Sequence, residues 1–165
     1  MLSGGGLTIF LRDWVTVYPM NHTTASLKTR SLTLIRANTS TKIWSQLDFP
    51  SSDITVMQIT GQWGKITTFN IYNDGENNKM IRLLTEFHHR NKATLERTPQ
   101  GEAHVIWLGD FNRHHPYWDS LEDTRLFTSE ATEVAEKLIE AMADMGLELV
   151  LPSGLPTHKH SITKC

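Results

Sequence analysis

The chain has little cysteine, little charge imbalance and no long apolar run, and each absence excludes a class of protein. Its single cysteine, Cys165, is the last of 165 residues, so no disulfide can form within the chain. The 16 Lys and Arg residues nearly balance the 18 Asp and Glu residues, for a formal net charge of −2. This balance excludes a supercharged tail and gives no electrostatic sign of nucleic-acid binding. The apolar run 7–11 is too short for a signal core or a membrane span, so we expect an intracellular protein without a membrane segment.

What is present is the composition of a globular domain. Hydrophobic residues make up 39% of the chain and charged residues 21%, values that exclude a disordered chain. The length allows one domain with a buried core. The glycines at 4–6 lack the Lys-Ser/Thr pair of a phosphate-binding loop. We therefore expect residues 1–13 to form an irregular N-terminal segment and residues 14–165 to form the folded domain.

The first half of the chain reads as strands and the second half alternates helices with strands. Alternating β-branched and aromatic residues predict strands at 14–18, 31–35, 54–60 and 65–72. A helical period then begins after Asn77 or Asn78. The nearly continuous apolar run 103–108 predicts a strand buried on both faces, followed by a helix from about 130 to 145 with Ser129 as its cap and by a further strand at 147–151. This order predicts an α/β domain with mixed sheets.

The segment that carries chemistry is 108–119, LGDFNRHHPYWD. A strand would deliver Asp110 and Asn112 to its carboxyl end, where open α/β sheets place ligands. If the extended backbone continues, both side chains point to one side and Phe111 points into the core. A carboxylate can take a proton from water and an amide can donate to a phosphate oxygen. The pair therefore suits phosphoester hydrolysis, and a simple turn after a strand is the structural alternative.

The segment 109–112, GDFN, resembles the signature of the endonuclease/exonuclease/phosphatase superfamily, which includes deoxyribonuclease I and inositol polyphosphate phosphatases. The longer string GDFNRHHPYWD resembles the endonuclease domain of non-LTR retrotransposons, and most of all that of fungal elements. Residues 69–73 resemble the strand that delivers the family's active-site Tyr and Asn, and 131–158 resemble its downstream helix, strand and turn. The resemblance implies a deoxyribonuclease I-like fold, a partial four-layer α/β sandwich with mixed β-sheets.

The resemblance also implies roles for individual residues. Asp110 would orient or activate the attacking water, and Asn112 would bind the scissile phosphate. Tyr72 would donate a hydrogen bond to the phosphate or the leaving oxygen. Asn73 is the corresponding amide, although many relatives have two residues between this Tyr and Asn. The family implies Mg²⁺ as cofactor, with Mn²⁺ as a substitute, DNA as partner and a nuclear location, and the residues after the signature that would contact nucleic acid are Arg113, His114 and His115.

The sequence departs from the family at both ends. No Glu precedes Glu76, so the metal-ligating Glu of an early strand is not found, and neither is the catalytic His of a final Ser-Asp-His motif. We therefore expect a domain that lacks edge strands at both termini and is inactive or nearly inactive by itself. No metal ligand is assigned, and the adjacent pair His114-His115 does not have the spacing of a zinc site. Two alternatives remain: a phosphatase or repair endonuclease of the same fold, and a non-catalytic retroelement relic.

Overall fold

The computed structural model describes residues 12–23 and 29–155. The chain divides into two compact units, of which the first comprises residues 1–74 and 82–111 and the second comprises residues 75–81 and 112–165. Most of the predicted irregular segment 1–13 lies outside the described residues, and Arg12 and Asp13 form a turn. No helix among the described residues is long and apolar enough to cross a bilayer.

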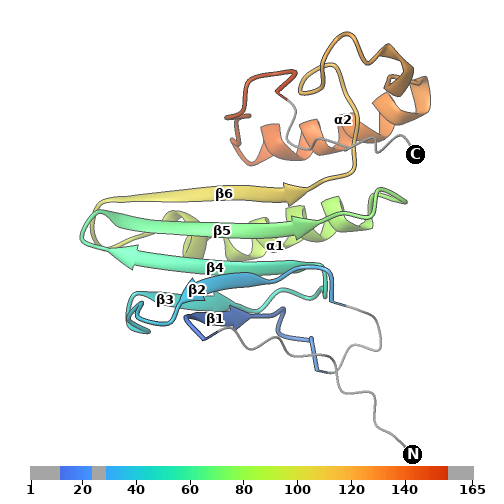
Figure 1. Ribbon diagram of the computed structural model, residues 1–165. Helices are drawn as coiled ribbons and strands as arrows, with labels where there is room; N and C mark the ends of the chain where they lie inside the picture. Colours follow the sequence, from blue (N-terminus) through green and yellow to red (C-terminus); the bar gives the residue numbers. More distant parts are fainter. Residues whose placement is uncertain (1–11, 24–28, 156–165) are drawn as a thin grey trace, which may run out of the picture. The chain divides into compact units, whose positions relative to one another are not determined.

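A four-stranded mixed sheet forms the centre of the first unit (Figure 1). Its strands follow the order β3 (Trp44–Leu47), β4 (Ile54–Gly61), β5 (Gly64–Tyr72) and β6 (Glu102–Asp110). The first three are antiparallel, with a two-residue turn between β4 and β5, whereas β5 and β6 are parallel. The predicted α/β class with a mixed sheet is thus confirmed.

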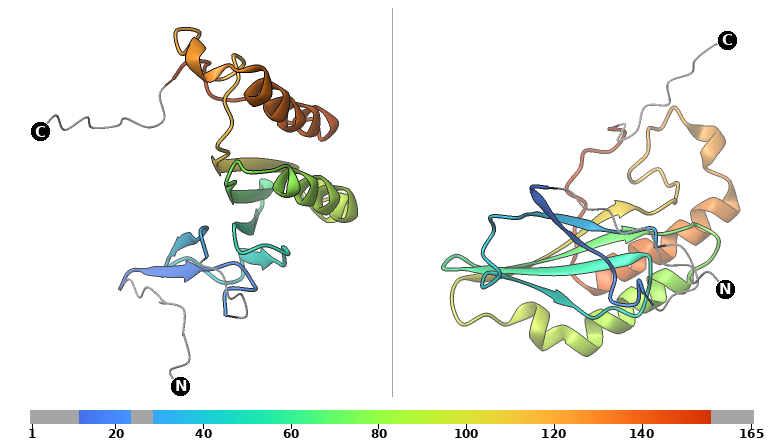
Figure 2. Two further views of the ribbon diagram at one scale, coloured as in Figure 1. Left: turned by 90° about the vertical axis from the view of Figure 1, so that its right-hand side faces the viewer. Right: turned by 60° about the horizontal axis from the view of Figure 1, so that its bottom comes forward.

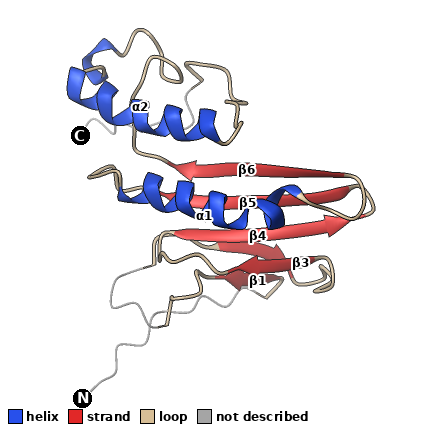
Figure 3. Ribbon diagram, turned by 180° about the vertical axis from the view of Figure 1, so that it is seen from behind, coloured by secondary structure: helices blue, strands red, loops and turns tan. Residues whose placement is uncertain are grey.

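Helix α1 (Lys79–Glu96) connects the two parallel strands, because parallel neighbours need a crossover of a dozen or more residues. The side chain of Asn77, one of the two predicted cap residues, accepts a hydrogen bond of 2.8 Å from the backbone N–H of Lys79, the first residue of α1. Figure 3 shows α1 lying along one face of the sheet. On that face Phe87 of α1 contacts Phe69 of β5 at 5.7 Å between ring centroids. The buried apolar core includes Phe49, Ile54, Val56, Ile71, Leu84 and Leu95.

A two-stranded antiparallel sheet of β1 (Trp14–Val17) and β2 (Thr33–Arg36) lies on the other side of the four-stranded sheet (Figure 2). Hydrogen bonds between the two residues that precede β2 and Asn70 of β5 connect the two sheets. The Asn70 side chain donates to the carbonyl of Leu32 at 2.6 Å, and the Ser31 hydroxyl donates to the carbonyl of Asn70 at 2.8 Å. These hydrogen bonds fix the small sheet against β5.

The second unit is built around α2 (Ser129–Asp144), which follows the short 3₁₀ helix η1 (Thr124–Leu126). Thr128, not the predicted Ser129, caps α2, because its side chain accepts from the backbone N–H of Ala131 at 3.1 Å. Gly146 ends the helix as predicted, with a φ of +65°. The residues of α2 that are fully buried are Ala135, Leu138 and Ala141.

Two predictions about strands are wrong, and one strand was not predicted. Residues 147–151 form no strand, and Val150 is 90% exposed, because no neighbouring strand pairs with this segment among the described residues. The strand over 103–108 exists as β6 but is not buried on both faces, since Ile106 and Leu108 are each 43% exposed. The short strand β3 was not predicted, because WSQL has neither alternation nor a β-branched residue.

Candidate functional site

The carboxyl ends of β5 and β6 bring together three of the four predicted catalytic residues. Tyr72 and Asp110 are the last residues of the two strands and are partners in the parallel register, so their side chains project from the same face of the sheet. Asn73 follows directly, and its backbone N–H donates to the carbonyl of Asp110 at 2.8 Å. The edge formed by Tyr72, Asn73 and Asp110 is called the β5–β6 edge below.

The three side chains of the β5–β6 edge differ in their access to solvent. Asp110 is exposed and Tyr72 is half-buried, whereas Asn73 is only 1% exposed. The Asn73 amide donates to the carbonyl of Phe111 at 2.9 Å. Asn73 therefore holds the chain where it leaves β6, and the two groups that a substrate can reach are the carboxylate and the phenol.

Gly109 allows β6 to lie close to β5 immediately before Asp110. Its φ is +133°, and a Cβ at this position would collide with the carbonyl oxygen of Ile71. The glycine therefore serves the close approach of the two strand backbones at this edge.

A cation that no sequence motif identifies lies beside Tyr72. The guanidinium of Arg30 binds the carboxylate of Asp53 in a two-bonded fork, with distances of 2.8 Å from Nε and 2.7 Å from Nη2. Nη2 also lies 3.3 Å from a carboxylate oxygen of Asp74. The guanidinium carbon lies 4.6 Å from the centroid of the Tyr72 ring, within the range of a cation–π contact.

Arg30, Asp53 and Asp74 form a cluster that is shielded from solvent to a greater degree than an ordinary surface ion pair. The side chain of Asp53 is only 13% exposed, that of Asp74 is 31% exposed and that of Arg30 is 38% exposed. The hydrogen bonds to Asp53, followed by the charges of Asp53 and Asp74, raise the pKa of Arg30 above its ordinary value. No motif marked these residues, because Arg30 and Asp53 lie 23 positions apart and meet only once the two sheets pack together.

The remaining part of the signature lies in the second unit, and its backbone differs from the prediction. Asn112 is exposed and has a φ of +46°, so the extended conformation ends and the expected alternation of 110, 111 and 112 does not hold. Phe111 is half-buried. Asn112 remains a predicted phosphate ligand that no observation tests.

Arg113 is buried, with 8% of its surface exposed. Its guanidinium donates to the backbone carbonyls of Gly75 and Asn77, the latter at 2.8 Å. Such carbonyl contacts hold the loop before α1, and they leave little of the cation for a phosphate. Arg113 thus stabilises this loop, and its contact with nucleic acid stays a prediction from the family resemblance.

The loop after Arg113 is held by Asp119. Its carboxylate accepts from the backbone N–H of His115 at 2.9 Å and lies 3.3 Å from the ring Nδ1 of His114. His114 remains half exposed, at 49% of its side chain, and the backbone N–H of Tyr117 donates to the ring of His115 at 3.0 Å. Across residues 12–23 and 29–155, no group of three His, Cys, Asp or Glu side chains is placed to hold a metal ion. His158 and His160 lie outside the described residues.

Two comparisons with known proteins give matches. The family described as endonuclease-reverse transcriptase matches residues 66–164. The solved endonuclease domain of TRAS1, a telomere-specific non-LTR retrotransposon, matches with a TM-score of 0.57 and 16% identity, over 89% of this chain and 59% of that domain. No curated protein matches.

The structural likeness confirms the deoxyribonuclease I-like α/β fold, and this chain spans 59% of the length of the solved domain. The family match covers the β5–β6 edge, the GDFN signature and both helices. The chain belongs to the endonuclease-reverse transcriptase family.

Proposed function

We propose that this chain is a DNA endonuclease domain of the retrotransposon type, which hydrolyses phosphodiester bonds at the β5–β6 edge. One observation carries the proposal: the exposed carboxylate of Asp110 and the half-buried phenol of Tyr72 are register partners on one face of the sheet. The family match supports nuclease-type chemistry. The substrate is inferred to be DNA, and a domain of this type would act in the nucleus.

Each reachable group has a distinct task in such a reaction. Asp110 can accept a proton from water or fix the direction of its attack. The Tyr72 hydroxyl can donate a hydrogen bond to an oxygen of the phosphate, where negative charge develops. Arg30 covers the Tyr72 ring and so limits the directions in which that hydroxyl points. The exposed amide of Asn112 is of a type that donates to a phosphate oxygen without adding charge, and this role stays a prediction from the family resemblance.

The proposed cofactor is Mg²⁺, with Mn²⁺ as a substitute. When bound, a divalent ion offsets the negative charge of the phosphate and of the leaving oxygen. Asp110 is a suitable hard oxygen ligand, but the described residues contain no group of three ligating side chains, and Mg²⁺ gives up its water reluctantly. The described residues thus do not make a tight site by themselves, and we expect weak metal binding and slow turnover.

The charge of the two units favours the first unit as the one that meets DNA. By sequence, the first unit carries 10 Lys and Arg against 8 Asp and Glu, and the second carries 6 against 10. An excess of cations supplies the non-specific attraction to phosphate. The weak overall charge of −2 therefore conceals an uneven distribution.

Nicking of supercoiled plasmid tests the proposal. We expect slow conversion to the relaxed form at millimolar Mg²⁺ or Mn²⁺, loss of conversion with a chelator, and a decrease of about a hundredfold in Asp110→Ala. Asp144→Ala, which removes an exposed carboxylate of the second unit, is the matched control and should nick at the parent rate. Nicking that persists in the chelator, or that is unchanged in Asp110→Ala, contradicts the proposal.

The alternative is a non-catalytic retroelement relic, and the missing group of metal-ligating side chains among the described residues favours it. A relic would give no nicking at any metal concentration. A phosphatase or a repair endonuclease of the same fold would instead release phosphate from inositol phosphates or cut abasic DNA, activities that we expect to be absent.

A further inference from the structure

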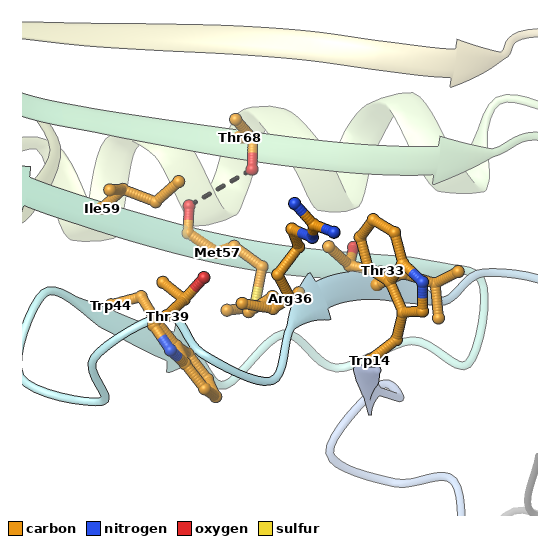
Figure 4. Close-up of a pocket in the computed structure, with 10 residues that line it drawn as sticks. Trp14, Thr33, Arg36, Thr39, Trp44, Met57, Ile59 and Thr68 are labelled. Atoms are coloured by element: carbon orange, nitrogen blue, oxygen red, sulfur yellow. Dashed lines mark hydrogen bonds between the residues drawn. The ribbon is translucent and has the colours of Figure 1, made fainter. Parts of the chain in front are cut away.

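A cavity of about 300 Å³ lies in the first unit between the β1–β2 sheet and the four-stranded sheet (Figure 4). Its walls include Trp14, Arg36, Trp44, Met57, Ile59 and Thr68. This volume is at the lower end of the range found for small-ligand pockets. We call it the inter-sheet cavity.

The geometry points to the inter-sheet cavity as a binding site for a single nucleotide of the DNA strand, with the base between the apolar walls and the phosphate at Arg36. The inference rests on the proposed function for the choice of DNA as the partner. It adds a subsite, because none of the residues of the β5–β6 edge lines the cavity.

The apolar walls suit a flat aromatic group. Two indoles line the cavity, from Trp14 of β1 and Trp44 of β3, and the buried Met57 of β4 also contributes to its walls. Aromatic side chains stack on every base, whatever its identity, and a thioether makes favourable contacts with ring edges. Trp14 is 41% exposed, so the cavity can be entered beside this residue.

The positive charge of Arg36 makes the cavity favour an anionic ligand over a neutral one. It is the only charged residue among those that line the cavity, and its guanidinium carbon lies 5.7 Å from the centroid of the Trp14 ring. Within residues 12–23 and 29–155 it forms no ion pair with a carboxylate, unlike Arg30. A guanidinium stacked on an aromatic ring and open to solvent is well suited to hold a phosphate.

The distance between the cavity and the β5–β6 edge is short enough for one continuous DNA strand to reach both. Thr68 in the cavity wall and Tyr72 at the edge are four residues apart on β5 and project from the same face. At about 3.3 Å per residue this separation is about 13 Å, which corresponds to a few nucleotides at about 3.4 Å each along one strand. A base turned out of the stack could therefore enter the cavity while a neighbouring phosphate lies at the edge.

Binding of mononucleotides, followed by tryptophan fluorescence, tests the inference without requiring catalysis. We expect saturable quenching by deoxyadenosine monophosphate and much weaker effects of deoxyadenosine or inorganic phosphate alone. Arg36→Gln should weaken binding roughly tenfold, and the matched control Lys42→Gln, at a nearby exposed cation outside the cavity, should not.

Two further variants separate the possible outcomes. Ile59→Trp places a larger side chain in the cavity wall, at a position that is 37% exposed, and should abolish binding while the urea transition of the chain is retained. Asp110→Ala should bind the nucleotide normally, so a failure of the nuclease proposal and a failure of this inference are distinguishable. No saturation with the parent chain, equal binding of phosphate alone, or tight binding of anilinonaphthalene sulfonate without nucleotide binding would each overturn it.

Discussion

Replacement of Arg30 by Ala tests whether the cluster beside Tyr72 stabilises the fold. The fork to Asp53 has distances of 2.7 and 2.8 Å, and the variant would leave the Asp53 carboxylate, only 13% exposed, without its cation. Loss of one partner from a fully buried pair costs about 3–5 kcal/mol, whereas an exposed pair contributes about 0–1 kcal/mol. Because 38% of the Arg30 side chain is exposed and solvent screens it, we expect a loss of about 1–3 kcal/mol in the free energy of unfolding.

Urea unfolding followed by circular dichroism measures this loss, and a double-mutant cycle assigns it. Asp53→Asn alone should also destabilise the chain, and the double variant should lose less than the sum, with a coupling energy of about 1 kcal/mol. If Arg30→Ala changes the free energy by less than about 0.5 kcal/mol, or if the two substitutions are additive, the fork does not stabilise the unit.

Three further predictions concern the first unit. Lys65 is buried and donates hydrogen bonds to carbonyls at the C-terminal end of α1. Lys65→Met should therefore lower the free energy of unfolding by about 1 kcal/mol, measured by urea unfolding. An unchanged urea midpoint would contradict this prediction. Burial lowers the pKa of His88 below 6.5, so the parent should lose stability as the pH falls below about 6.5, where the unfolded chain takes up the proton first. His88→Leu should reduce the difference in unfolding free energy between pH 7.5 and 5.5, and an equal difference would refute this origin. Gly109→Ala should lower the melting temperature through a cost of about 1–3 kcal/mol at its φ of +133°, and an unchanged melting temperature would show that the backbone can relax.

Local patterns predicted the elements whose sequence repeats with a clear period. Strands β4 and β5 and both helices follow from the alternation at 54–60 and 65–72 and from the helical period after Asn77. Segment 147–151 has an equally good strand pattern but forms none, because a strand requires a pairing partner that its own residues do not encode. The degree to which β6 is buried likewise depends on the segments that cover the sheet, which the residues of β6 themselves do not encode.

The candidate site was predictable where it depends on a motif and unpredictable where it depends on packing. Tyr72 and Asp110 were identified from short signatures, and the register of β5 and β6 places them together. Arg30 and Asp53 carry no motif, since their contact is made only when the small sheet packs on β5. The left-handed backbone of Asn112 also escaped prediction, because period-two alternation assumes that the strand continues.

The rate at which the chain nicks supercoiled plasmid when Tyr72 is replaced by Phe shows whether the β5–β6 edge is the reaction site. Tyr72→Phe removes only the hydroxyl and keeps the ring on which the Arg30 guanidinium lies, so the urea midpoint should not change. We expect metal-dependent nicking by the parent and a decrease of about a hundredfold in the variant, the usual cost of one lost donor to developing charge. Nicking by the variant at the parent rate would contradict the assignment of the β5–β6 edge as the reaction site.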